Sequence, residues 1–331
     1  MSIYRRTSVD AALYVLRDIG RDMTKTQRQV STGLRVERAS DNGAYWAISS
    51  TLKTDQKAQS AIRDALGLAA ATMGTAFTAV DQAIDLVSQI KAKLVAATES
   101  GVDKDKVSAD IEQLKDQLRS VAQSASFNGD NWVAIDDADD PSKPRQIPAS
   151  FTRFSDGSVR VDTLSYEVDL APVGSTSSKD ARYLIDDRTS GSGEYGALTS
   201  QYFATEARAS QDYVMLKSAG NSAGQVEIGV SSGTTQDEVK EMITVVDMML
   251  SQMTTVGSAF GALEQRISMQ SDFAQSLDDA FSRGIGRLVD ADMEEQSSRL
   301  RALQTQEQLG LQSLNIANAS YDTVRQLFQN L

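Results

Sequence analysis

Two missing residue types limit the chemistry of this chain. Its 331 residues contain no cysteine and no histidine. Disulfides, thiol nucleophiles, cysteine or histidine metal sites and histidine general bases are therefore excluded. Carboxylate pairs, serine–lysine dyads and carboxylate metal sites remain chemically possible, but the sequence shows no catalytic constellation of these types. We expect a structural protein, not an enzyme.

Three local patterns could hold an ion or a phosphate, and each has a simpler explanation. The acidic run at 136–140 lacks the spacing of a calcium loop and is typical of a solvated loop. Met248, Met249 and Met253 have helical spacing, which favours core packing over a soft-metal site. The segment 191–193 lacks the glycine-rich phosphate pattern with a lysine. We expect no cofactor and no bound metal.

Composition also limits the partners. The net charge is −12 and no basic run is present, so a nucleic-acid partner is not expected. No run of about 18 apolar residues exists, which argues against membrane insertion. The first residues are basic but no apolar segment follows them, so we expect no cleaved secretory signal. If the protein leaves the cell, it uses a route without one.

Proline divides the chain into helical arms and a different middle. All four prolines, Pro141, Pro144, Pro148 and Pro172, lie in the middle. Proline in a helix interior costs about 3 kcal/mol, so only the flanks are suited to long helices. We predict a mainly α fold, with terminal coiled-coil helices, a long helical rod domain and a smaller α/β insertion domain.

Apolar residues recur in the arms with steps that alternate between three and four. The pattern covers residues 80–97, 107–125, 239–281 and 289–331, with glycines at 101, 284 and 286 as expected interruptions. A sustained seam of period 3.5 is typical of coiled-coil packing. The N-terminal seam consists of Val9, Leu13, Leu16, Gly20, Met23, Gln27, Val30 and Leu34.

The middle of the chain has strand patterns instead. Residues 151–154 and 159–161 flank Asp156-Gly157, which predicts a β-hairpin. Apolar residues alternate again along 164–170 and 226–230. We expect strands there, connected by loops rich in serine, threonine and glycine.

Two short blocks at opposite ends of the chain look like helix junctions. In the first block a glycine ends a helix, and Ser40 or Asp41 can cap the next one. The second block places acidic residues at a helix start, where they complement the helix dipole. The residues of the two blocks are Ser31, Gly33, Leu34, Arg35, Ser40, Asp41 and Asn42, then Asp290, Ala291, Asp292 and Met293.

Together these blocks closely resemble those of bacterial flagellin. The first matches the family form SSGLR followed by an A-K/S-D-D/N turn, and the second matches I-x-D-A-D-M-A-x-E. The C-terminal run at 314–318 also resembles the last helix of the family. The resemblance covers about 1–130 and 235–331. Tyr45, Trp46 and the segment 126–132 resemble flagellins of soil and plant-associated alphaproteobacteria.

The resemblance implies a subunit that is exported and polymerises into the flagellar filament for swimming. It implies filament-core helices at 1–40 and 287–331, inner rod helices at 41–130, a surface-exposed variable domain at 131–235 and a returning rod helix at 236–286. It implies copies of itself and other flagellins as partners, with hook-associated junction and cap proteins, an export chaperone and the flagellar export apparatus. The expected location is the secreted filament.

We expect the terminal seams to form the polymerisation interface, because a helix with one apolar stripe is marginal in water and needs partners. The expected interface residues are Leu13, Leu16, Met23, Val30, Leu34, Leu300, Leu303, Leu314, Ala317, Tyr321, Val324, Phe328 and Leu331.

Three alternative functions stay open at this point. A hook–filament junction protein of the same family would share the terminal seams. A coiled-coil signalling protein would have similar heptads, but it would need membrane spans or a ligand domain. A secreted effector would need a catalytic constellation.

Overall fold

The computed structural model describes residues 3–99, 101–138, 145–166, 183–189, 195–220 and 224–329, with side chains described except at 3–9, 166 and 317–329. The chain divides into two compact units. One unit, here named the terminal unit, consists of Met1–Lys57 and Leu277–Leu331. The other, the central unit, consists of Ala58–Ser276.

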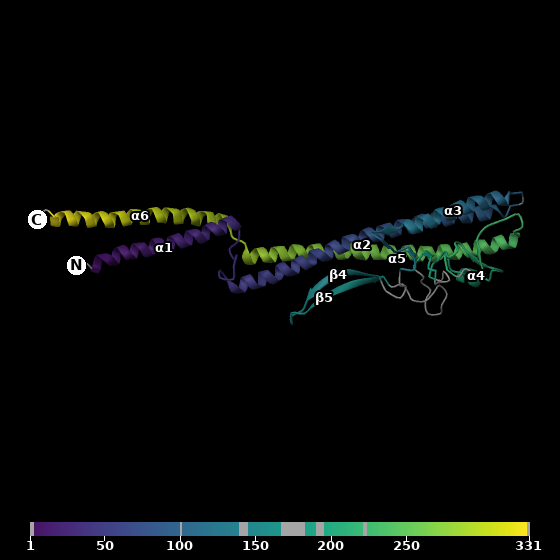
Figure 1. The fold of residues 1–331 in the computed structure, drawn as a ribbon, viewed down its shortest axis with the longest axis horizontal. Helices are drawn as coiled ribbons and strands as arrows, with labels where there is room; N and C mark the ends of the chain where they lie inside the picture. The colour runs from purple at the N-terminus through teal and green to yellow at the C-terminus, as the bar shows by residue number, and fades with distance from the viewer. Residues whose placement is uncertain are drawn as a thin grey trace. The chain divides into compact units, whose positions relative to one another are not determined.

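The terminal unit is built from α1 (Ile3–Thr32), α6 (Met293–Gln329) and the nearer parts of α2 (Gly43–Ala96) and α5 (Gln236–Val289). Helices α1 and α6 contact each other and run side by side, with the start of α1 and the end of α6 at the same end of the pair (Figure 1). Helices α2 and α5 are linked in this unit by Gln56, whose Nε2 donates to Ser282 Oγ at 2.8 Å.

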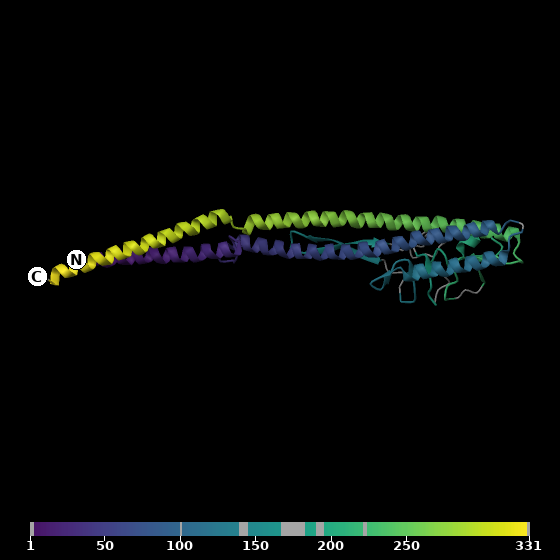
Figure 2. The ribbon, with the colours of Figure 1, turned by 90° about the horizontal axis from the view of Figure 1, so that it is seen from above.

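The central unit contains the rest of α2 and α5 together with α3 (Lys104–Ser124), and Figure 2 shows these helices running alongside one another. The break between α2 and α3 contains Gly101, as predicted, and Asp103 caps α3 by accepting from Lys106 N. The predicted mainly helical fold is confirmed. No helix in the described ranges is both long enough and apolar enough to cross a membrane.

The predicted heptad seams form the core of the central unit. A Cβ built on Gly257 of α5 would lie 3.5 Å from Val80 of α2, so the two helices approach closely there. Met249 and Met253 are fully buried, which agrees with core packing. Seam residues that are at most 1% exposed include Val80, Ala83, Val87, Ile90 and Leu94 from α2, Ala97 directly after it, and Val246, Phe260 and Ile267 from α5.

The predicted β-hairpin is confirmed. Strands β4 (Arg145–Arg153) and β5 (Val159–Tyr166) pair antiparallel, with a register shift between Pro148 and Ser150. Their turn contains Asp156, whose Oδ1 accepts from Ser158 N at 2.8 Å, and Gly157 at φ +85°. The continuation of the predicted strand beyond Tyr166, and Pro141, Pro144 and Pro172, lie outside the described residues.

The other strands in the described part of the middle segment are two or three residues long. They are β1 (Ser126–Phe127), β2 (Asp130–Asn131), β3 (Ala134–Ile135), β6 (Ile185–Asp186), β7 (Asp212–Val214) and β8 (Gln225–Glu227), with the short helix α4 (Tyr202–Glu206). Strand pairs this short cannot enclose a core alone. Buried side chains here, such as Leu184 and Phe203, belong to the same cluster as those of α2, α3 and α5.

Candidate functional site

The structure brings the two terminal motif blocks together. Arg35 N donates to Val289 O at 2.7 Å, and Ala291 N donates to Gly33 O at 2.9 Å. These backbone bonds join the chain after α1 to the chain between α5 and α6. Because the two blocks meet in one place, we call this place the motif junction.

Glycine ends α1 as predicted. Gly33 has φ +71°, a left-handed conformation that a glycine adopts without strain, and its N–H donates to Gln29 O at 2.9 Å. The left-handed residue turns the chain out of the helix. The next residues are thereby directed toward α5.

The first block does not cap α2 as predicted. Neither Ser40 nor Asp41 is the cap: Asn42 Oδ1 accepts from Tyr45 N at 3.1 Å. Asp41 closes the preceding turn instead, because its Oδ2 accepts from Glu37 N at 3.2 Å and Arg38 N at 3.1 Å. Asparagine and aspartate side chains both make such local backbone bonds, so residue type alone does not decide between Asp41 and Asn42.

The hydrogen bonds to Asp41 also affect its ionisation. The N–H of Arg38 is the largest cause that lowers the pKa of the Asp41 carboxyl. The N–H of Glu37 and the charges of Lys25 and Arg28 act in the same direction. The ionised carboxylate is therefore the form that holds this turn.

The second block starts α6, but the preceding break differs from the prediction. Helix α5 does not stop at Gly284 or Gly286, because Asp290 N still donates to Gly286 O at 2.9 Å. Isolated glycines cost a helix about 1 kcal/mol each without ending it. The helix ends at Val289, and Ala291 N donates to Gly33 O in the first block. Asp292 then caps α6, with Oδ1 accepting from the N–H groups two and three residues later at 2.9 and 3.2 Å.

The side chain of Arg35 connects the junction to α5. An Arg35 Nη2 group donates to Leu288 O at 3.1 Å, near the C-terminal end of α5, where a cation is favoured. Its guanidinium lies 5.8 Å from the centre of the Tyr45 ring. Gln29 Nε2 donates to Arg35 O at 3.1 Å. One side chain thus connects segments 253 positions apart in the sequence.

The junction also contains a small apolar cluster, and Leu34 pairs with Asp290 there as an isolated antiparallel bridge. Ser31, Ser40 and Met293 are exposed, so these motif residues contribute no core contact. The cluster consists of Val36, Ile285 and Val289, with Leu34, Leu52 and Leu288 packed against it.

The predicted interface residues differ in exposure. Leu303 is buried, whereas Leu13 is 37% exposed. Leu16 approaches α6 closely, since a Cβ built on Gly310 would lie 2.8 Å from Leu16 Cδ2. Those that are half-buried are Leu16, Met23, Val30, Leu34, Leu300 and Leu314. The side chains of Ala317, Tyr321, Val324 and Phe328, and all of Leu331, lie outside the described residues.

Sequence reasoning missed a second set of apolar residues on the same two helices. The sequence analysis chose one row of apolar residues on each helix and left out their apolar neighbours. These neighbours could have been found, because the apolar stripe is wider than two positions per heptad. These residues project into solvent. They are Tyr14 and Val15 on α1, at 66% and 56% exposure, and Leu309, Leu311 and Ile316 on α6, at 57%, 49% and 71%.

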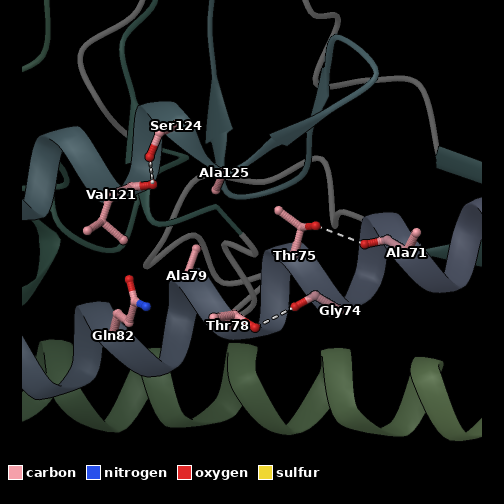
Figure 3. A pocket seen from close by; sticks show the side chains of 9 residues that line it. All are labelled: Ala71, Gly74, Thr75, Thr78, Ala79, Gln82, Val121, Ser124 and Ala125. Atoms are coloured by element: carbon pink, nitrogen blue, oxygen red, sulfur yellow. Dashed lines mark hydrogen bonds between the residues drawn. The ribbon is translucent and has the colours of Figure 1, made fainter.

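A shallow groove in the central unit shows no sign of chemistry. The groove has a volume of about 460 Å³ and is lined by α2, the end of α3 and Ala125 (Figure 3). The lining consists of small residues and neutral polar groups. The hydroxyls of Thr75, Thr78 and Ser124 donate to carbonyls of their own helices at 2.9, 2.8 and 3.2 Å. Groups bonded in this way favour packing rather than catalysis.

The described part of the acidic run is bonded as a loop. Asp136 Oδ1 accepts from Ala138 N at 2.8 Å, and Asp137 accepts from the backbone and hydroxyl of Thr189 at 2.8 and 2.5 Å. Asp139 and Asp140 lie outside the described residues. The two described carboxylates are thus used in turn and loop contacts.

Comparison with known proteins matches both ends of the chain. A model of the bacterial flagellin N-terminal helical region matches residues 7–136, and one of the C-terminal helical region matches 243–328. Flagellin C of Rhizobium meliloti (strain 1021) is 42% identical over 328 residues, covering 99% of both chains. Flagellin A of the same strain is 36% identical over 399 residues, covering 99% of this chain and 100% of its own length. A flagellin of Brucella melitensis is 32% identical over 329 residues, covering 99% of both.

Proposed function

Because this chain belongs to the bacterial flagellin family, as a rhizobial-type structural subunit that is exported and polymerises into the flagellar filament, we propose that α1 and α6 make its contacts with neighbouring subunits. The proposed interface contains the seam residues from Leu13 to Leu331 named from the sequence. It also includes the exposed apolar side chains of the same helices. The protein acts by assembly, and we propose that it has no enzymatic activity.

The observation that supports this interface most is the exposed apolar surface that remains after α1 and α6 pair. Leu309, Leu311 and Ile316 are each about half or more exposed. Burying one such side chain fully contributes about 1.5–3 kcal/mol. A neighbouring copy that covered them would gain this stabilisation at every subunit of the filament.

Repeated contacts of this kind lead to a filament if they do not close. A head-to-tail contact between different surfaces of identical subunits generates an open helical assembly. We therefore assign 1–40 and 287–331 to the filament core, and 41–130 with 236–286 to the rod around it. Residues 131–235 form the outer surface of the filament in this proposal.

The partners beyond the chain itself follow from this role. A growing filament needs a base and an end, so we propose contacts with hook-associated junction and cap proteins and with other flagellins. We also propose that an export chaperone covers the exposed apolar side chains of α6 before the chain passes through the flagellar export apparatus. Neither the junction-protein nor the signalling-protein alternative is favoured by the family matches, which cover both arms.

The interface can be tested with Leu314→Asp. The side chain is half-buried on α6, and a carboxylate left unpaired in an apolar contact costs several kcal/mol. We expect no filaments at concentrations about 100-fold above those at which the unmodified chain polymerises. Sedimentation and electron microscopy provide the measurement.

The matched control is Gln312→Asp, which adds the same charge at an exposed position of α6. It should form filaments, and both variants should keep the helical circular dichroism of the central unit. Filaments of normal length from Leu314→Asp would refute the proposed interface.

A further inference from the structure

A lysine lies in a row of buried apolar residues on α3. The buried residues of this helix are Ile111, Lys115, Leu118 and Ala122, at steps of four, three and four. The other three belong to the hydrophobic core of the central unit, and the side chain of Lys115 is only 3% exposed. A buried ammonium without compensation is strongly unfavourable, so the partners of Lys115 decide whether this position is stable.

Two carboxylates compensate the charge of Lys115. Its Nζ donates to Glu112 Oε1 of the same helix at 2.8 Å and lies 3.7 Å from Glu227 Oε2 of β8. Glu227 is held in place because its Oε1 accepts from Lys217 N at 2.9 Å. Glu112 faces the chain after β8, since a Cβ built on Gly229 would lie 3.8 Å from Glu112 Oε1. We name Lys115, Glu112 and Glu227 the lysine clasp.

The clasp joins α3 to residues 224–234, and other charged groups of α3 lie around it. Among the charged residues of this helix, Lys115 alone is buried. Toward α2, Asp110 pairs with Lys93 at 2.5 Å, and both side chains are about half exposed. The remaining contacts with the joined chain are those of Lys104 Nζ to Thr234 O at 2.6 Å, Asp105 Oδ1 to Ser232 N at 3.2 Å and Arg119 Nη2 to Lys217 O at 3.3 Å.

We infer that the lysine clasp is an acid-sensitive contact that releases residues 224–234 from α3. The ammonium of Lys115 stays charged in acid, whereas glutamates take up protons as the pH falls through their ordinary range near about 4.3. Protonation of Glu112 and Glu227 removes both counter-charges and leaves a buried cation unpaired. The clasp is therefore complete at neutral pH and lost in acid. The seam between α2 and α5 contains no part of it and stays packed.

Hydrogen exchange of the full chain tests this inference, with rates corrected for the direct effect of pH. One reporter is Ile228 N, which donates to Val214 O at 2.8 Å between β8 and β7. Strands of three residues do not keep such bonds once they leave α3. The other reporter is the seam of α2 between Val80 and Leu94. Between pH 7 and about pH 3, exchange should speed up about tenfold more at Ile228 than in the seam, and equal changes would overturn the inference.

Lys115→Met removes the cation and keeps an unbranched side chain at the buried position. In this variant the extra exchange at Ile228 in acid should fall to about threefold or less. The matched control is Lys93→Met, which removes a half-exposed lysine that also pairs with α3. Its acid response should equal that of the unmodified chain. A response in Lys115→Met as large as in the control would overturn the inference.

Glu227→Gln tests the clasp without acid, because it removes one counter-charge at every pH and keeps the shape of the side chain. At pH 7 we expect exchange at Ile228 to be about threefold or more faster than in the unmodified chain. An unchanged rate at Ile228 would also overturn the inference. All three variants are compared as monomers, so these outcomes leave the proposed role in filament assembly untouched.

Discussion

At the scale of single residues, the motif junction depends on side chains that bond the backbone. Asp41, Asn42 and Asp292 each accept backbone N–H groups at turns or helix starts. The sequence predicted a polar side-chain cap at the start of α2, but the residue it named was wrong, because Asn42 is the cap. It assigned the α2 cap to Ser40 or Asp41 because the exact turn geometry, set by Gly33 and by pairing with the second block, is not readable from local residues.

Asp41 leads to a pH prediction. Its pKa is lowered in the folded turn, so its contribution is complete above the pKa of an unperturbed aspartate, about 3.9, and is lost as the pH falls through the lowered value. The NMR shifts of the Glu37 and Arg38 amides should follow this titration. In Asp41→Asn, which does not titrate, they should stay constant, and a midpoint at or above the unperturbed value would contradict this account.

At the scale of elements, the pattern of apolar residues predicted the helices well because packing seams decide where long helices lie. The glycines were less informative. Gly101 marks a real break and has φ +102°, whereas Gly284 and Gly286 stay inside α5. Helix α5 ends instead at Val289, where backbone bonds join the chain to Gly33 and Arg35, and no local pattern contains such bonds.

The close approach of α1 and α6 can be tested at Gly310. A Cβ there would lie 2.8 Å from Leu16 Cδ2, so Gly310→Leu should overpack the seam at a cost of about 1–3 kcal/mol. We expect the critical concentration for polymerisation to rise about tenfold or more. Gly310→Ala should have a small effect, because the tip of Leu16 can move.

The double variant Leu16→Ala/Gly310→Leu is the matched test of this contact. Removing the crowding side chain should restore much of the polymerisation lost in Gly310→Leu, since neighbouring sites couple. Additive losses from the two single changes would show that α1 and α6 do not meet at this position in the filament.

At the scale of the whole molecule, the arms and the family were readable from the sequence, and the core of the middle segment was not. The strand patterns and loops of 131–235 predicted a smaller α/β insertion domain, and they gave no information on where its core would lie. In the structure Ile147, Leu184 and Tyr213 are buried in the same cluster as α2, α3 and α5. Contacts between such distant segments depend on the three-dimensional path of the chain.

The assembly account places the subunit contacts in the terminal helices, so the most direct measurement compares the full chain with a chain that ends at residue 288. Both are purified, seeded with ammonium sulfate and imaged by electron microscopy, with circular dichroism to verify that the central unit remains helical. The account predicts long filaments from the full chain and none from the shortened one, which lacks α6. Long filaments from the shortened chain would contradict it.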